Sequence, residues 1–173
     1  MLLVPEETRK RLLAERALPR ASEPEVEQRL KDAGLRPTRQ RVAIGRLLFG
    51  SAHRHVTADD LLQEANFAGE MLSLATIYNT LGHFSEAGLI RRISVDDERA
   101  HFDTDTGNHH HFYIEAEGLV LDVAPGGIAV ERLPTPPEGY EITRVDVVVR
   151  LTQVQPEPPA GQAMPDSGPR SLR

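Results

Sequence analysis

The order of its helical and strand patterns limits the fold of this chain more than any other feature of the sequence. Apolar residues first recur at helical spacing in four successive segments, and two short β-prone runs follow directly. The helical segments are residues 25–33, 38–49, 57–69 and 73–88, and the β-prone runs are residues 89–95 and 100–104. Helices followed at once by a hairpin are typical of a winged helix-turn-helix domain, in which the helix before the hairpin enters the DNA major groove.

Local signals mark where these elements begin and end. Thr38 and Ser73 are short polar residues of the type that caps a helix N-terminus. Gly34 and Gly88 stand where the first and last helices should stop, since glycine readily adopts the left-handed conformation of a helix C-terminus. Charged residues 96–99 separate the two β-prone runs and predict the turn of the hairpin.

The rest of the chain is richer in strands than in helices. Residues 112–116, 119–123 and 142–151 are rich in β-branched and aromatic side chains, and residues 128–133 are a further candidate strand. We therefore predict an α+β protein in which a winged helix-turn-helix domain precedes a small second domain built on a sheet.

Changes in composition divide the chain into four parts. We expect an N-terminal arm at 1–24, a winged-helix domain at 25–105, a second domain at 106–153 and a disordered tail at 154–173. The tail prediction rests on proline, because five of the chain's thirteen prolines lie between Pro156 and Arg173. Such a segment cannot bury enough apolar surface to order itself.

The chain contains no cysteine. This absence excludes disulfides, thiolate zinc sites, iron–sulfur clusters and cysteine nucleophiles, so any metal must be held by His, Asp or Glu. With 39% hydrophobic and 27% charged residues, and without an apolar run of bilayer length or a signal-peptide pattern, we expect a soluble cytoplasmic protein with no membrane partner.

Charge is distributed unevenly along the chain. Residues 1–102 carry fifteen basic and fifteen acidic side chains, whereas residues 103–173 carry five and eleven, so the whole net charge of −6 belongs to the second part. Residues 29–54 hold seven basic side chains against one acidic side chain. This stretch could face phosphate, or it could be an ordinary solvated helical surface.

The fourth helical segment carries residue types that read bases. If Leu74, Ile77, Leu81 and Phe84 pack inward, the opposite face presents Ser73, Thr76, Asn79 and Thr80, with Tyr78 at its margin. Asn can bond an adenine edge, and Thr and Tyr can contact thymine or phosphate. A plain polar face is the alternative, but the basic stretch before this helix and the hairpin after it favour DNA binding.

A histidine triplet opens the second domain. In an extended chain His109 and His111 point to one face and His110 to the other, so the first two can hold one metal ion or the iron of a haem. His55, Asp103 and Asp122 are further candidate ligands. A site made of these residues would connect the two domains, although a solvated loop is the alternative for such a run.

An enzyme is the alternative from another class. His109, His111 and Glu115 have the spacing of part of a cupin iron site, but the accompanying glycines are missing and no histidine follows His111. The sequence also lacks a nucleophile elbow, a P-loop and a dinucleotide fingerprint. We therefore expect no catalytic residues and no enzyme activity.

Several separated motifs resemble the Fur family of metal-responsive repressors over roughly residues 25–151. They are Ala33-Gly-Leu-Arg-Pro-Thr-Arg-Gln-Arg, Arg54-His-Val-Thr-Ala-Asp-Asp-Leu, Ser73-Leu-Ala-Thr-Ile-Tyr-Asn-Thr-Leu and the His triplet. Within that family, His109-His-His-Phe, Phe102-Asp-Thr and Arg144-Val-Asp-Val-Val-Val-Arg-Leu are similar to segments of the iron response regulators, Irr.

The resemblance implies a homodimeric repressor with a C-terminal α+β dimerisation domain, bound to a palindromic double-stranded operator of iron-control type. The implied DNA-binding residues are Arg36, Arg41, Ser73, Thr76, Tyr78 and Asn79. The implied metal ligands are His55, Asp103, His109, His111 and Asp122, for Fe(II), Mn(II) or Zn(II). The Irr-like segments further imply that haem binds at His109, His110 and His111 and lowers operator binding in the control of iron and haem metabolism.

Some family features are absent. Ile114 and Glu117 stand where many members have the cysteines of a structural zinc site, and Asn108 and Val145 stand where many have histidines of a second site. A cysteine–proline haem motif is also missing. The leading hypothesis is a haem-responsive regulator, and the rival is a regulator of the same fold that responds to a divalent metal without haem.

Overall fold

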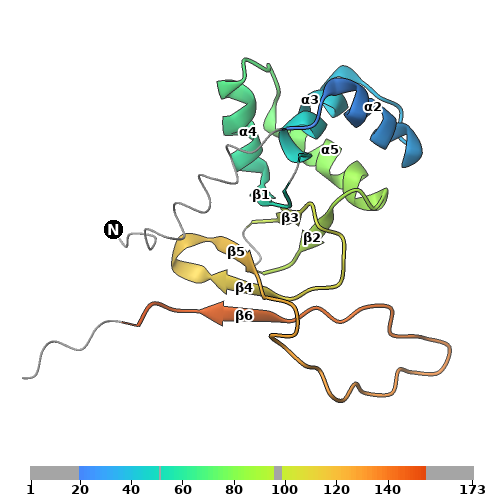
Figure 1. Cartoon of the computed structure of the whole chain (residues 1–173), viewed down its shortest axis with the longest axis vertical. Coiled ribbons are helices and arrows are strands. Elements are labelled where there is room, and N and C mark those ends of the chain that lie inside the picture. The colour runs from blue at the N-terminus through green and yellow to red at the C-terminus, as the bar shows by residue number, and fades with distance from the viewer. Residues whose placement is uncertain (1–19, 51, 96–98, 155–173) are drawn as a thin grey trace, which may run out of the picture.

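The computed structural model describes residues 20–50, 52–95 and 99–154. Most of the predicted N-terminal arm, the tip of the predicted hairpin and nearly all of the predicted tail lie outside the described residues. The described part forms three tiers, with four helices above a first small sheet and a second small sheet below it (Figure 1).

The four predicted helices are present. Helix α2 covers Glu23–Asp32 and begins before the predicted Glu25, α3 covers Arg39–Leu48, α4 covers Ala58–Phe67 and α5 covers Leu74–Glu86. Their inward faces share one apolar core. Its fully buried members include Val26, Leu30, Ile44, Leu61, Ile77, Leu81 and Phe84.

The predicted capping residues begin and end these helices. Thr38 Oγ1 accepts a hydrogen bond from the Arg41 backbone N–H at 3.4 Å, and Ser73 Oγ accepts one from the Thr76 N–H at 3.1 Å. Beyond the last helix, Gly88 has a φ of +71°, a backbone conformation that side chains disfavour. The chain therefore turns sharply from α5 into the next strand.

The first sheet contains three antiparallel strands in the order β1-β3-β2. They are β1 (His55–Thr57), β2 (Arg91–Ile93) and β3 (His101–Asp103). Strands β2 and β3 are the predicted wing hairpin, and β1 joins it from the segment before α4. Asp103 on the central strand is directly opposite His55 on one side and Arg91 on the other.

The second sheet has the order β5-β4-β6. Strand β4 (His111–Ile114) pairs antiparallel with β5 (Leu119–Asp122) and parallel with β6 (Val148–Leu151). A short 3-10 turn, η1 (Glu115–Glu117), links β4 to β5.

Two strand predictions need correction. The predicted strand at 142–151 forms only over Val148–Leu151, and residues 128–133 form no strand. The segment 124–147 extends away from both sheets (Figure 1) and carries Pro125, Pro134, Pro136 and Pro137. Proline has no N–H to donate to a neighbouring strand, so a β-prone composition is not enough for pairing here.

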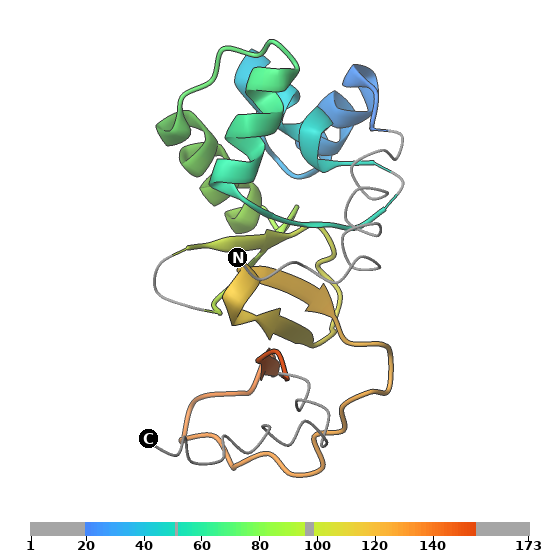
Figure 2. The ribbon, with the colours of Figure 1, turned by 90° about the vertical axis from the view of Figure 1, so that its left-hand side faces the viewer.

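A small second core connects the two sheets. Ile93 and Val95, at the end of β2, pack with Tyr113 and Val120 of the second sheet. The view turned by 90° shows the same succession of helices, first sheet and second sheet (Figure 2). The chain is therefore an α+β protein with an N-terminal winged helix-turn-helix unit, as predicted. None of the helices in the described part of the chain is long and apolar enough to cross a membrane.

Candidate functional site

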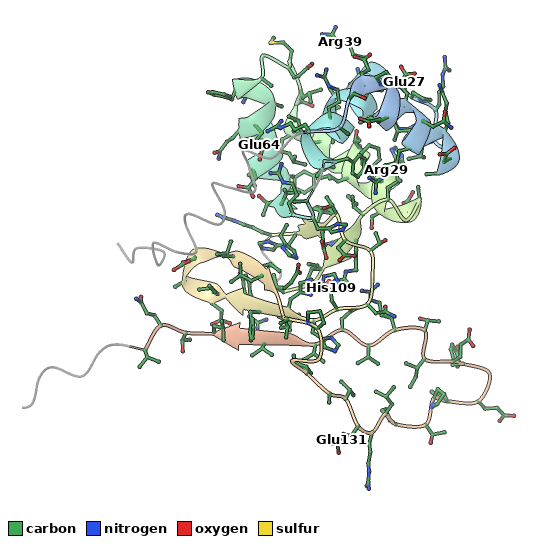
Figure 3. The ribbon with its side chains drawn as sticks, viewed as in Figure 1. Glu27, Arg29, Arg39, Glu64, His109 and Glu131 are labelled. Atoms are coloured by element: carbon green, nitrogen blue, oxygen red, sulfur yellow. The ribbon has the colours of Figure 1, made fainter. Side chains whose placement is uncertain are left out.

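Five predicted ligand residues converge between the two sheets. They come from different parts of the chain, yet one ligand atom of each lies within 4.8 Å of those of all the others. Figure 3 shows His109, one of the five, at the level where the sheets face each other. The members of this cluster, called the His/Asp cluster below, are His55, Asp103, His109, His111 and Asp122.

Strand register explains the convergence. In the first sheet His55 is opposite Asp103, and in the second sheet His111 is opposite Asp122, so each sheet presents one His/Asp pair. His109 precedes β4 and lies two residues before His111, which places it on the same face of an extended chain. The His-x-His spacing therefore adds the fifth ligand.

The contacts within the cluster are short. His109 Nε2 lies 2.9 Å from Asp103 Oδ2 and 3.2 Å from Asp122 Oδ1, and His55 Nε2 lies 3.1 Å from Asp122 Oδ1. Asp103 and His111 are almost completely buried, whereas the Asp122 side chain is 41% exposed. The centre is thus closed on the protein side and open at Asp122.

The electrostatics of the cluster favour the ionised form of Asp122. The hydrogen bond from His55 lowers the pKa of Asp122 below its ordinary value, and the charges of His55, His109 and His111 lower it further. Partial burial raises this pKa, with an effect smaller than that of the hydrogen bond but larger than that of any one histidine charge, and the net shift is downward. Near neutral pH Asp122 therefore offers a charged oxygen ligand.

The donor set fits a divalent metal ion. Three imidazole nitrogens and two carboxylate oxygens are ligands for Fe(II), Mn(II) and Zn(II), and five donors exceed the four of a usual structural zinc site. His55 Nε2 is buried among these donors, 3.1 Å from Asp122 Oδ1 and 3.7 Å from Asp103 Oδ2.

His110 is separated from its two neighbours, as the alternation of an extended chain predicts. Its Nδ1 accepts a hydrogen bond from the Val147 backbone N–H at 3.3 Å, beside β6. Glu115, the residue of cupin-like spacing, pairs with Arg150 at 2.6 Å instead of joining the cluster. The triplet therefore does not act as one set of ligands in this structure.

Helix α5 presents part of the predicted base-reading set. Ser73, Tyr78 and Asn79 are exposed and Thr76 is partly exposed. Two side chains differ from the prediction, since Thr80 is buried and Leu74 is 36% exposed. The helix is rotated so that Thr80 joins Ile77 and Leu81 in the core, because an inward face depends on neighbouring elements as well as on periodicity.

The two predicted arginines are placed differently. Arg36 is exposed before α3. Arg41 donates a hydrogen bond to the Arg36 carbonyl oxygen at 3.0 Å and lies 3.3 Å from His83 Nδ1 on α5. Arg41 therefore links the Arg36 backbone to α5.

Two arginines beside the cluster were not predicted from the sequence. Arg91 reaches into it from β2, and Arg54, next to His55, forms a largely buried pair with Glu64 of α4. A basic residue within or next to a short strand of largely buried residues was the available signal. The sequence pattern alone did not show which carboxylates these arginines would meet.

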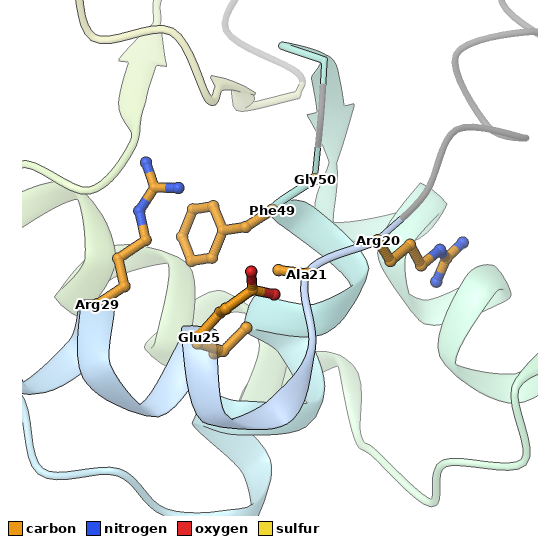
Figure 4. Close-up of a pocket in the computed structure, with 7 residues that line it drawn as sticks. Arg20, Ala21, Glu25, Arg29, Phe49 and Gly50 are labelled. Carbon is orange, nitrogen blue, oxygen red and sulfur yellow. The ribbon is translucent and has the colours of Figure 1, made fainter.

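A separate hollow lies on the helical tier, between the start of α2 and the end of α3 (Figure 4). The Arg29 guanidinium stacks over the Phe49 ring at 4.2 Å, and Glu25 accepts hydrogen bonds from Ser22. These charged groups already have partners, so the hollow is a packing feature without a reactive group.

A winged-helix unit joined to a second sheet through a ligand cluster defines a class of protein, the ligand-sensing DNA-binding regulator. The sequence profile of the ferric uptake regulator family matches residues 32–150, and the chain belongs to this family. Its members are transcription regulators and not enzymes, so the enzyme alternative is excluded as expected.

Individual relatives agree with this assignment. The peroxide-responsive repressor PerR of Staphylococcus aureus is 36% identical over 115 residues, which cover 66% of this chain and 77% of PerR. The Pseudomonas aeruginosa ferric uptake regulator with manganese matches 75% of this chain and 98% of its own, with 27% identity and a TM-score of 0.57. The Vibrio cholerae ferric uptake regulator, at 23% identity and a TM-score of 0.58, shares the fold over 73% of this chain and 98% of its own.

Proposed function

We propose that this chain is a transcriptional repressor that binds Fe(II) or Mn(II) in the His/Asp cluster and gains operator affinity when it does so. The convergence of five ligand atoms within 4.8 Å is the observation that carries this proposal. Zn(II) remains a competing ion because imidazole and carboxylate also bind it.

The two sheets divide the ligands between them. His55 and Asp103 belong to the first sheet, which is connected to α4 and α5 of the winged helix-turn-helix unit. The other three ligands belong to or adjoin the second sheet. A metal ion that needs all five favours arrangements in which both sheets are in place. Metal binding and one orientation of α5 are thereby linked.

The DNA side of the proposal rests on α5 and the residues before α3. Tyr78 and Asn79 would contact base edges, and Ser73 and Thr76 would contact phosphates near the N-terminus of the helix. Arg41 would contact the DNA backbone nearby, and Arg36 would approach the neighbouring minor groove. Because bound phosphates release counterions, operator affinity should fall steeply with salt.

A homodimer on a palindromic operator completes the proposal. The segment 124–147 exposes several large apolar side chains below the second sheet, and a second copy of the chain would cover them. They are Val130, Leu133, Tyr140 and Ile142. Sedimentation of the purified protein should give twice the monomer mass. Charged substitutions at Leu133 and Ile142 should lower the measured mass toward that of the monomer.

Control by haem is the second candidate. The consecutive histidines and the Irr-like segments favour it. Its geometry would differ from that of the metal site, since His111 is only 1% exposed and is surrounded by the cluster, while His110 lies on the other face. A haem that uses the triplet would require these side chains to rearrange and would lower operator affinity.

One pair of titrations tests both candidates. Mn(II) binding to metal-free protein is followed by electron paramagnetic resonance, and haem binding is followed by Soret absorption. His109→Ala should abolish tight Mn(II) binding, and the matched variant His110→Ala should retain it. Saturable haem binding that is lost in His110→Ala, without Mn(II) binding in the wild type, would replace the metal proposal with the haem proposal.

The resemblance to PerR adds a response to test. If the cluster also serves a peroxide response, the Fe(II)-loaded protein should lose operator binding after brief exposure to hydrogen peroxide. The Mn(II)-loaded protein should keep it under the same treatment. Equal behaviour of both forms would restrict the proposal to metal sensing.

A further inference from the structure

The guanidinium of Arg91 reaches into the His/Asp cluster. Its Nη2 lies 3.0 Å from His111 Nε2, 3.1 Å from His109 Nε2 and 3.3 Å from Asp103 Oδ2. These three atoms are the ligand atoms that the cluster would offer to a metal ion. A permanent positive charge thus stands among them.

The guanidinium contacts the ring nitrogens of two candidate metal ligands. Arg91 Nη2 shares the Nε2 atoms of His109 and His111 with Asp103, whose Oδ2 lies 2.9 Å from the first and 3.4 Å from the second. The same Nε2 atoms are the ones a metal ion needs. Arg91 therefore occupies the side of both rings that a metal ion would use.

Arg91 also supplies a countercharge. Asp103 is completely buried, and its Oδ1 accepts the Asp105 backbone N–H at 2.7 Å while its Oδ2 faces Arg91. A buried carboxylate without an opposite charge is strongly unfavourable. A divalent ion at the cluster would itself supply the positive charge that Asp103 needs. It would also repel a guanidinium left beside it.

We propose that Arg91 is an internal cation of the metal-free cluster, which a divalent metal ion must displace in order to bind. The proposal rests on the metal-sensing function above and adds the residue that sets the metal affinity. In the metal-free state Arg91 keeps the cluster assembled. On metal binding its guanidinium leaves the ligand atoms.

The displaced guanidinium has a place to go. Arg91 Nη1 already donates to the Gly107 carbonyl oxygen at 3.1 Å and lies 3.5 Å from Asp146 Oδ1. The Asp146 side chain is 47% exposed and lies at the edge of the cluster. A rotation of the guanidinium about this edge gives up Asp103 and keeps Asp146, whose Oδ1 also accepts a hydrogen bond from Arg144 Nε at 2.7 Å, so the charge of Arg91 stays paired.

The displacement would be transmitted to the DNA-reading unit. Arg91 begins β2, close after Gly88 at the end of α5, and is directly opposite Asp103 in the sheet. When the Arg91 side chain changes its partner at this position, the short connection between α5 and the wing is affected. Metal binding would thus change contacts in the winged helix-turn-helix unit as well as in the second sheet.

The test compares Mn(II) affinity in Arg91→Gln with that in the matched variant Arg92→Gln, whose side chain is exposed on the same strand. Removal of the competing cation should tighten Mn(II) binding by roughly ten-fold or more, and the metal-free form should melt at a lower temperature. Arg92→Gln should change neither. Unchanged or weaker Mn(II) binding in Arg91→Gln would overturn the proposal.

Asp103→Asn separates this failure from failure of the metal site itself. If wild-type protein binds Mn(II) and Asp103→Asn does not, the metal site is established whatever Arg91 does. If neither binds and Arg91→Gln also does not, both proposals fail.

A measurement on the wild type does not depend on the folding of a variant. The Arg91 Nε–H signal in nitrogen-15 spectra, identified by its loss in Arg91→Lys, should be protected from water exchange without metal. Saturation with Zn(II), which is diamagnetic, should remove that protection. Protection that persists at full Zn(II) occupancy would contradict displacement.

Discussion

His55 Nε2 lies 3.1 Å from Asp122 Oδ1, and this contact joins the first sheet to the second. His55 belongs to β1, which leads directly into α4, and Asp122 ends β5. The two residues are 67 positions apart, so only the folded arrangement of the two sheets brings them together. A metal ion between them would respond to that arrangement and would in turn stabilise it.

Asp103→Asn should remove the buried carboxylate of the cluster and with it tight metal binding. Even outer partners of metal ligands change affinity by about 10–100-fold, so loss of this ligand should weaken Mn(II) binding by at least about 100-fold. Calorimetric titration measures the change, with the exposed Asp59→Asn as control. Wild-type affinity in Asp103→Asn would remove Asp103 from the ligand set.

Asn79→Ala should reduce operator discrimination without changing stability, because the side chain is exposed on α5. A base contact of this kind contributes about 1–3 kcal/mol against the wrong base, and Tyr78→Ala should act similarly. Competition between a selected operator and random duplex measures the discrimination. Asn66→Ala, exposed on α4, is the control. Equal discrimination in all three variants would move base reading away from α5.

Glu64→Ala should destabilise the fold because it leaves Arg54 without its carboxylate. Arg54 also donates to the Leu47 carbonyl oxygen at 2.8 Å, and both charged side chains are largely buried. Removing one partner of such a pair costs about 3 kcal/mol, measurable as a lower urea midpoint. The paired replacement Arg54→Met with Glu64→Leu should recover much of this loss. An effect of Glu64→Ala no larger than that of the exposed Glu86→Ala would show that the pair is not structural.

Ser22→Ala should raise the pKa of Glu25. Hydrogen bonds from the Ser22 hydroxyl and backbone N–H lower this pKa below its ordinary value near 4.5. Since the folded pKa is the lower one, the stabilising contribution is complete above pH 4.5 and is lost as the pH falls through the lowered value. Carboxyl titration by NMR measures both proteins. An identical Glu25 pKa in each would mean that the serine hydroxyl does not act on it.

The sequence predicted the parts of this protein that depend on local signals. Caps such as Thr38 and Ser73 and stops such as Gly34 and Gly88 act within a few residues, so the helices and the wing followed from them. The structure of the segment 124–147 was harder to predict, because a β-prone run forms a strand only if it pairs with a partner strand, which the sequence does not identify.

The ligand set was predicted through the family resemblance and the His-x-His alternation, and the structure brings its five members together. Arg91 was not predicted, since its role depends on the register that sets it opposite Asp103. The exposure of Leu74 and the burial of Thr80 likewise depend on how α5 is rotated against its neighbours. These features arise from tertiary packing and leave little trace in a single sequence.

Operator binding with and without Mn(II) shows whether the His/Asp cluster controls DNA binding. An operator is first selected from a pool of random duplexes, and its affinity is measured by fluorescence anisotropy for wild type, the double variant His109→Ala/His111→Ala and the control His53→Ala. Mn(II) should raise the operator affinity of wild type and of the control but not that of the double variant. An affinity that is the same with and without Mn(II) in wild type, or an equal response in the double variant, would contradict this role of the cluster.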